Sequence, residues 1–398
     1  MSHTIKDIGQ VMATLEREFP LRRWKAEMSD SRPRPQIPAG TIAQLVVEMV
    51  PRMQPSLLAV DQSARLPEIR VHHGSRRQLV ASDSTMERSL RGFDLAVLHR
   101  VLWELGRCLR RQRELALTLP SGVRATVGMV DGSSWGAELG SVLLVTGDGL
   151  DVAVGYRMSP GRGHELQTTR ALLAEAVERY GQGWVQYLVV DGLYLTEEDL
   201  RRGLRHWGHQ LVVKTTEEET LAVLQDAGGL FFAEGGPLEG VEVVEGFDEV
   251  RQESYRILGC GGFFWHGLTL KVAYVSEHPV KPRAGRQEKP FWVVTTDEGL
   301  SLEDMRFLAH RRWHVENNGF RILNQLVGSK RRLTKQPTVR EALLGLWLIG
   351  LDLFLFAARR FALRRRPPRW RTMKWTLCWC AQMFARLTLL TYGTSQVT

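Results

Sequence analysis

Two aspartates follow runs of apolar residues in the same way. Asp131 comes after Val-Gly-Met-Val and precedes Gly132, and Asp191 comes after Tyr-Leu-Val-Val and precedes Gly192. A carboxylate in such a place lies where a strand leaves the core, and the glycine lets the chain turn or another group approach closely. A single Asp-Gly pair is more often a simple turn. Its repetition after two predicted strands favours a site at one edge of a sheet.

Glu316 supplies a third carboxylate, on a predicted helix that contains Arg-Arg-Trp-His-Val-Glu. It lies beside a stripe of apolar residues, so it can face the strand ends while the helix packs on the sheet. A lone glutamate on a helix is usually solvated, but Arg312 and Trp313 in the turn before it favour a site. Three carboxylates provide the oxygen ligands that two divalent ions sharing a phosphate require.

The helix that carries Glu316 is predicted to begin after Ser301, its expected N-cap, and to end at Gly328. Its apolar stripe consists of Met305, Leu308, Val315, Gly319, Ile322 and Leu326. His310 and His314 are four residues apart on it, a spacing that could bind a metal. Without a further ligand this signal is weak, and we favour a surface or DNA-facing role for both histidines.

The elements before this helix follow a recognisable order. Three strand-like segments follow one another from residue 125. After them come a helix (165–181), a strand ending at Asp191, a second helix (196–208) and a strand (209–216). The order βββαβαβ is that of the ribonuclease H fold. We therefore predict an α/β chain with a ribonuclease H-like mixed sheet flanked by helices.

Five regions are expected along the chain: a helical, DNA-binding N-terminal region (1–124), the first part of the core (125–216), a β-rich insertion (217–299), the core helix with Glu316 (300–330) and a basic helical C-terminal region (331–398). The most apolar run, residues 343–358, is shorter than the roughly 20 residues that span a membrane and contains Asp352. We predict a buried helix there and no membrane contact.

The composition is that of a globular protein, with 43% hydrophobic and 24% charged residues among 398. The chain has 53 Lys and Arg against 44 Asp and Glu, and the excess of positive charge lies in residues 328–398. Such a positive region suggests either a polyanionic partner or a solvated basic face. Four cysteines without a CxxC pair suggest neither disulfides nor zinc, and the first residues do not resemble a signal peptide, so we expect a cytoplasmic protein.

These residues resemble a known family. Asp131 in Val-Asp-Gly-Ser, Asp191 in Val-Val-Asp-Gly and the motif Arg312 to Glu316 after a β-insertion look like the Asp-Asp-Glu transposases of the insertion-sequence 4 type. The resemblance covers about residues 80 to 355. Two positions depart from it, because the family often has Tyr where this chain has Ala309 and a basic residue where it has Leu323.

The resemblance implies an Mg²⁺-dependent transposase that cuts and joins DNA, with Asp131, Asp191 and Glu316 holding two Mg²⁺ ions, for which Mn²⁺ can substitute. It also implies double-stranded transposon ends and target DNA as partners, a homodimer on that DNA, and a prokaryotic, nucleoid-associated location.

Several basic and aromatic residues are expected to contact DNA. Arg312 can bind phosphate and Trp313 can stack on an unpaired base. The other expected phosphate contacts are Arg321, Lys330, Arg331, Arg332, Arg359 and Arg360. The basic residues of the N-terminal helices, among them Arg110 and Arg113, are expected to recognise the ends of the element. Trp265 and Trp292 in the insertion are further stacking candidates, although each is more often a core residue.

Two alternatives remain open. One is a catalytically silent DNA-binding protein derived from a transposase, which the three intact carboxylates disfavour. The other is a structure-specific nuclease of the same fold, which would cut DNA without joining it.

Overall fold

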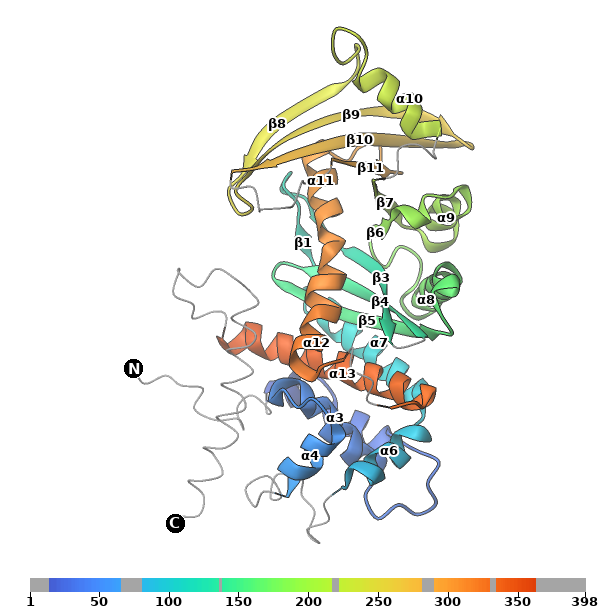
Figure 1. The fold of residues 1–398 in the computed structure, drawn as a ribbon, viewed down its shortest axis with the longest axis vertical. Coiled ribbons are helices and arrows are strands. Elements are labelled where there is room, and N and C mark those ends of the chain that lie inside the picture. The colour runs from blue at the N-terminus through green and yellow to red at the C-terminus, as the bar shows by residue number, and fades with distance from the viewer. Residues whose placement is uncertain are drawn as a thin grey trace, which may run out of the picture.

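The computed structural model describes residues 14–65, 81–135, 138–216, 222–280, 290–329 and 334–362. Figure 1 shows three parts along the long axis: a curved β-layer with α10, a central sheet between helices, and a group of helices at the other end. The fold is thus mixed α/β, as predicted.

One sheet of nine strands runs through the upper two parts, in the order β5-β4-β3-β6-β7-β11-β10-β9-β8. Its first five strands are those predicted: β3 (Val127–Trp135), β4 (Glu138–Gly147), β5 (Leu150–Ser159), β6 (Tyr187–Asp191) and β7 (Gln210–Thr215). β3 to β5 form an antiparallel meander, and β6 and β7 run parallel to β3. Parallel neighbours need crossover connections, and helices supply them: α8 (Glu165–Tyr180), α9 (Glu197–Arg202) and a π-helical turn (Gly203–Trp207).

The insertion extends this sheet and does not form a second one. β11 (Phe291–Thr295) pairs with β7, and the next strands outward are β10 (Leu268–Pro279), β9 (Glu253–Trp265) and β8 (Glu242–Asp248). A helix that the sequence pattern did not indicate, α10 (Ala222–Phe231), packs on β9. Its Phe231 stacks on Trp292 with 5.9 Å between ring centroids. Trp292 is therefore a core residue, which the sequence favoured over stacking on DNA.

The helix predicted between Ser301 and Gly328 is present but divided. It consists of α11 (Leu302–Arg311), a π-helical turn (Val315–Phe320) and α12 (Arg321–Val327). Ser301 Oγ accepts a hydrogen bond from the Asp304 N–H at 3.1 Å, and Gly328 ends α12 in the left-handed conformation, so both predicted ends are confirmed. The predicted apolar stripe is buried. These segments cross one face of the sheet from β9 and β10 to β3, β4 and β5 (Figure 1).

The remaining helices gather beyond β5. They are α2 (Leu21–Glu27), α3 (Ala39–Arg52), α4 (Leu57–Ala64), α6 (Asp83–Arg91), α7 (Leu95–Arg111) and α13 (Pro337–Ala357), which a last π-helical turn (Ala358–Ala362) follows. A short hairpin of β1 (Leu117–Thr118) and β2 (Arg124–Ala125) leads from α7 to β3. Both α7 and α13 pack on β5, and α13 also packs on α3.

The apolar run in α13 is a buried helix, as predicted. By length and composition α13 is, within the described ranges, the one helix that could cross a membrane, but most of it is buried inside the protein. Asp352 is buried in it, and its Oδ1 accepts a hydrogen bond from the Ala153 N–H of β5 at 3.0 Å. Burial raises the pKa of Asp352 well above its usual range.

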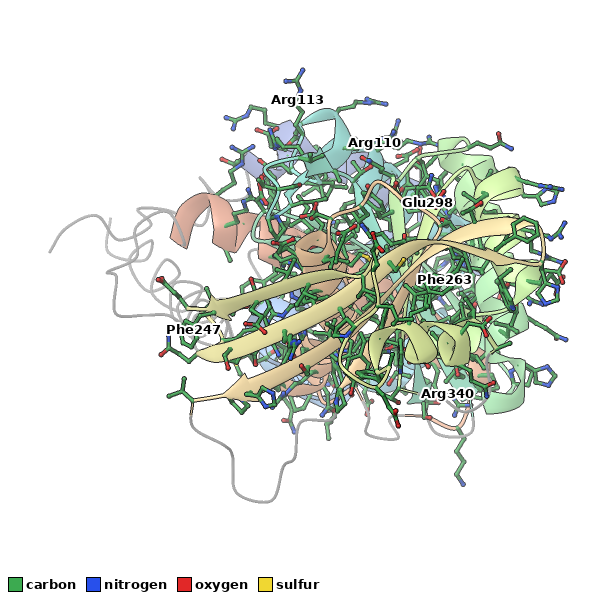
Figure 2. The ribbon with its side chains drawn as sticks, turned by 90° about the horizontal axis from the view of Figure 1, so that it is seen from above. Arg110, Arg113, Phe247, Phe263, Glu298 and Arg340 are labelled. Atoms are coloured by element: carbon green, nitrogen blue, oxygen red, sulfur yellow. The ribbon has the colours of Figure 1, made fainter. Side chains whose placement is uncertain are left out.

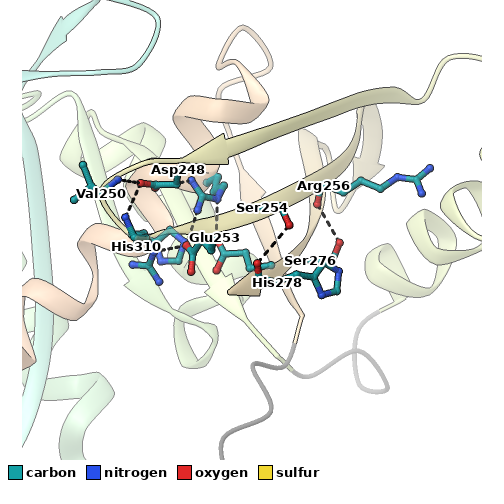
Figure 3. A network of polar contacts seen from close by, with 11 residues as sticks. Asp248, Val250, Glu253, Ser254, Arg256, Ser276, His278 and His310 are labelled. Atoms are coloured by element: carbon teal, nitrogen blue, oxygen red, sulfur yellow. Dashed lines mark hydrogen bonds and ion pairs between the residues drawn. The ribbon is translucent and has the colours of Figure 1, made fainter. Parts of the chain in front are cut away.

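Arg306 of α11 joins the insertion to the core helix. Its guanidinium lies 3.2 Å from Asp248 of β8, 2.7 Å from Glu253 of β9 and 2.6 Å from Glu277 of β10. Figure 3 shows this network, in which His310 also contacts Glu277. Because Glu253 and Glu277 are almost fully shielded from solvent, they depend on this positive charge.

We expect Arg306→Met to lower the free energy of unfolding by about 3–5 kcal/mol, since it leaves buried carboxylates without their main partner. Arg256→Ala is the matched control, because Arg256 forms an exposed ion pair with Glu245 at 3.3 Å on β8 and β9. Its loss should cost less than about 1 kcal/mol. Urea unfolding of both variants measures the difference, and equal losses would show that Arg306 does not anchor the insertion.

Candidate active site

Neighbouring parallel strands bring Asp131 and Asp191 to one level of the sheet. The last pair between β3 and β6 joins Met129 to Val189, and each aspartate lies two residues beyond it. Adjacent strands are about 4.8 Å apart, so the two carboxylates lie side by side. The pattern placed Asp131 at a strand end, but β3 continues to Trp135 because β4 still pairs with it after β6 has ended.

Arg312 bridges the two carboxylates. Its Nη1 lies 3.4 Å from Asp131 Oδ2 and 2.9 Å from Asp191 Oδ2. The arginine side chain is only 14% exposed, whereas that of Asp191 is 49% exposed, so the pair opens to solvent on the Asp191 side. The residue follows α11 directly, where the helix gives way to the π-helical turn, a distortion frequent at functional sites.

The glycine after each aspartate is required by close approach, as predicted. A Cβ on Gly132 would lie 2.8 Å from Glu165 Oε1, and a Cβ on Gly192 would lie 2.6 Å from Thr215 Oγ1. Any larger residue would push these neighbours away from the strand ends. The two glycines thus keep the surroundings of the acid pair tight.

Burial raises the pKa of Asp131 to about 6. The Arg312 guanidinium and the Gly132 N–H lower this pKa, and the nearby carboxylates of Asp191 and Glu165 raise it further. Desolvation prevails because the side chain is only 21% exposed. An added cation at this place would therefore favour the charged form of Asp131.

Glu316 lies four residues after Arg312, in the π-helical turn, and its side chain is exposed. Among the described residues, ion pairs at this place join Arg312 to both aspartates. Trp313 is 37% exposed, and the Arg312 guanidinium lies 5.4 Å from its ring centroid. Arg321 is also exposed and donates to Asn317 Oδ1 at 3.2 Å. The helix therefore presents Trp313, Glu316 and Arg321 to solvent.

Two charged residues beside the acid pair were not predicted from the sequence. Glu165 begins α8 and approaches Gly132 from the opposite face of β3. Lys214 of β7 is in register with Asp191, and its Nζ lies 3.7 Å from the Phe291 ring centroid. Burial lowers the pKa of Lys214 to about 8. The strand register reveals Lys214 and the packing of α8 reveals Glu165, whereas no local motif marks either residue.

The two helix histidines do not form a site together, and their predicted surface or DNA-facing role was wrong. His310 Nε2 lies 2.6 Å from Glu277 of β10, and His314 Nδ1 lies 2.9 Å from Asp151 of β5. Both carboxylates are buried by the helix that crosses them, so each histidine packs at the helix–sheet contact. Ala309 and Leu323, which replace the family's Tyr and basic residue, are fully buried as well.

Other predicted DNA contacts fall in different places. Lys330, Arg331 and Arg332 lie outside the described residues, whereas Arg359 and Arg360 form ion pairs with Glu114. In the N-terminal region Arg110 and Arg113 project from the surface at the end of α7 (Figure 2). Trp265 is partly buried beside the core.

The residues at the acid pair fit a divalent cation. Asp131 and Asp191 offer carboxylate oxygens, the ligands that Mg²⁺ prefers, and a positively charged nitrogen already lies within reach of both. A second group, Glu253, Glu277 and His310, has ligand atoms within 4.8 Å of one another. There Arg306 and Arg251 already contact the carboxylates, so their charge is matched without an ion.

In buffer with EDTA we expect Asp131→Asn to stabilise the protein at pH 8 by roughly 1–3 kcal/mol. Between about pH 4 and pH 6 Asp131 carries a proton in the folded protein but not in the unfolded chain. The contribution of Asp131 to the free energy of unfolding therefore falls as the pH rises through this range, and it stays low above pH 6. At pH 3 the variant should gain little. Urea unfolding at both values tests this, with Asp226→Asn on exposed α10 as the control. The same gain at both values would contradict a buried, charged Asp131.

Comparison with protein families gives an independent result. Residues 140–351, more than half of the chain, match the family described as Transposase DDE domain. The match runs from within β4 to within α13, so it contains Asp191 and Glu316 and begins after Asp131. A comparison with curated proteins finds no match. Since the family match covers most of the ribonuclease H-like sheet and the helix that crosses it, the chain belongs to the transposase DDE domain family.

Proposed function

We propose that this chain is an active DNA transposase whose catalytic residues are Asp131, Asp191 and Glu316. One observation carries the proposal: in a member of this family, two aspartates on adjacent strands lie together and share one cationic partner. Asp131 is largely buried beside Asp191, which costs free energy, and this cost is explained if catalysis requires the pair.

The three carboxylates are proposed to hold two Mg²⁺ ions, which Mn²⁺ can replace. Bound there, the ions would activate water or a DNA 3′-hydroxyl and stabilise the leaving oxygen in an in-line displacement. The chain's own residues would place the DNA. Arg312 and Arg321 would bind phosphate, and the exposed ring of Trp313 would stack on an unpaired base at the transposon end.

The finer assignment to the insertion-sequence 4 type rests on the motif from Arg312 to Glu316. We also propose double-stranded transposon ends and target DNA as substrates, a homodimer on DNA, and a cytoplasmic, nucleoid-associated site of action in a prokaryote. The basic Lys330, Arg331 and Arg332 are proposed to add contacts to phosphate that do not depend on sequence.

The direct test incubates the full chain with the DNA ends that flank its own gene, in Mg²⁺, and separates the products on a gel. Cleavage followed by strand transfer supports a transposase. Cleavage without joining identifies a nuclease of the same fold, and DNA binding without cleavage identifies a silent relative.

We expect Asp131→Asn, Asp191→Asn and Glu316→Gln each to reduce Mg²⁺-dependent cleavage at least 10³-fold, since one lost carboxylate removes most of the charge that places the ions. DNA binding, measured by gel shift, should change less than about threefold. Glu303→Gln, in the first turn of α11, is the matched control and should cleave normally. Retained cleavage in any of the three carboxylate variants would remove that residue from the proposed site.

Trp313→Ala should slow end processing at least tenfold while it changes the affinity for duplex DNA less than about threefold. The reason is that an exposed ring can stack on an unpaired base but contributes little to gripping a duplex. Single-turnover cleavage and gel shift measure the two effects. Trp313→Phe should recover part of the rate, and an equal loss of rate and affinity would indicate that the residue only packs the helix.

A further inference from the structure

Arg312 lies where a metal ion would have to act. A single nitrogen, Nη1, contacts Oδ2 of Asp131 and Oδ2 of Asp191, so one oxygen of each carboxylate is already engaged by a guanidinium. The two carboxylates carry two negative charges and this contact supplies one positive charge. The two aspartates therefore keep a net negative charge while Arg312 engages one oxygen of each.

The guanidinium is held at one end only. Its Nε is buried and has no hydrogen-bond partner, although a guanidinium can donate five hydrogen bonds in a planar fork. An unpartnered buried donor costs free energy, and a phosphate that received it would recover that cost. The exposed Trp313 ring lies 5.4 Å from the guanidinium carbon on the solvent side, so the arginine has an aromatic surface along which to move outward.

A divalent ion and this guanidinium oppose each other at the same oxygens. Both are positive, and within a few ångströms in a partly buried site they repel strongly. Lys214, in register with Asp191 on the next strand, adds a further positive charge to this part of the sheet. Metal binding at the acid pair thus favours departure of Arg312, and its departure is easiest when another anion receives it.

We propose that Arg312 is a gate on the acid pair: it competes with divalent cations for Asp131 and Asp191 until a DNA phosphate draws it away. This inference rests on the proposed function and adds an order of assembly, in which DNA and metal promote each other's binding. By linkage, the factor by which DNA tightens metal binding equals the factor by which metal tightens DNA binding. The gate keeps the protein from holding a fully charged metal site before its substrate arrives.

The test measures metal binding and does not depend on activity. Mn²⁺ is titrated into the full-length protein without DNA, and free Mn²⁺ is followed by electron paramagnetic resonance. Arg312→Gln, which removes the charge but keeps a hydrogen-bonding side chain, should bind Mn²⁺ about tenfold more tightly than the wild type. Arg256→Ala removes the same charge from an exposed ion pair with Glu245, away from the acid pair, and its affinity should stay within about twofold. Unchanged or weaker binding by the Arg312 variant would overturn the gate.

A second measurement uses the unaltered protein. Addition of a duplex carrying the flanking DNA ends should tighten Mn²⁺ binding by the wild type about tenfold, and this increase should disappear in Arg312→Gln. No increase in the wild type would overturn the proposal, even if the variant did not fold. Asp191→Asn separates the two hypotheses: if Mn²⁺ binding does not depend on Asp191, the proposed metal site fails, whereas binding that depends on Asp191 and is indifferent to Arg312 removes the gate alone.

Discussion

Asp131 and Asp191 repel each other, and their shared contact with Arg312 is what allows them to lie side by side on neighbouring strands. Much of the surrounding structure serves this contact. The parallel register of β3 and β6 sets the level of the two carboxylates, and glycines after them admit close neighbours. Arg312 does not belong to the sheet and must be positioned above the two strands. The helix that crosses the sheet provides this position.

The crossing helix is fixed by charge as well as by apolar packing. Arg306 contacts acids on β8, β9 and β10, His310 contacts Glu277, and His314 contacts Asp151 on β5. Arg312 lies between His310 and His314, so the helix is fixed to the sheet on both sides of the residue that reaches the acid pair. The β-insertion therefore takes part in positioning the site, because three of the anchoring carboxylates come from it.

The sequence predicted much of this arrangement. The strands β3 to β7 carry apolar runs closed by turn residues, and Ser301 and Gly328 mark the ends of a helix by local chemistry, so these features could be read directly. The π-helical turn could not, because the apolar stripe from Val315 to Leu326 has the same spacing in a continuous helix. α10 was missed because its Ala-Gly-Gly segment has low helix propensity, and it forms because Phe231 packs against Trp292.

Contacts between distant segments account for the remaining differences at the site. Asp131, Asp191, Glu316 and Arg312 were identified from strand ends and helix spacing, whereas Glu165 and Lys214 join them only through strand register and the packing of α8. The histidines were misjudged for the same reason. A histidine beside a stripe of apolar residues can face solvent or a buried carboxylate, and only the path of the helix across β10 and β5 decides between them.

The same path explains why Ala309 and Leu323 depart from the resembled family. Both are buried, Ala309 in α11, which packs on the sheet, and Leu323 in α12, which packs on α3 and α13, so a tyrosine or a basic side chain would have no solvent or phosphate to meet. The contacts with DNA that we propose for this helix would then come from its other side, where Trp313, Glu316 and Arg321 are exposed at successive helical turns. The two departures are thus consistent with the proposed site, since the face that packs and the face proposed to meet DNA remain separate. The DNA contacts that the resembled family makes through Tyr and a basic residue at positions 309 and 323 would then have to come from residues on that exposed face or from the basic residues that follow the helix.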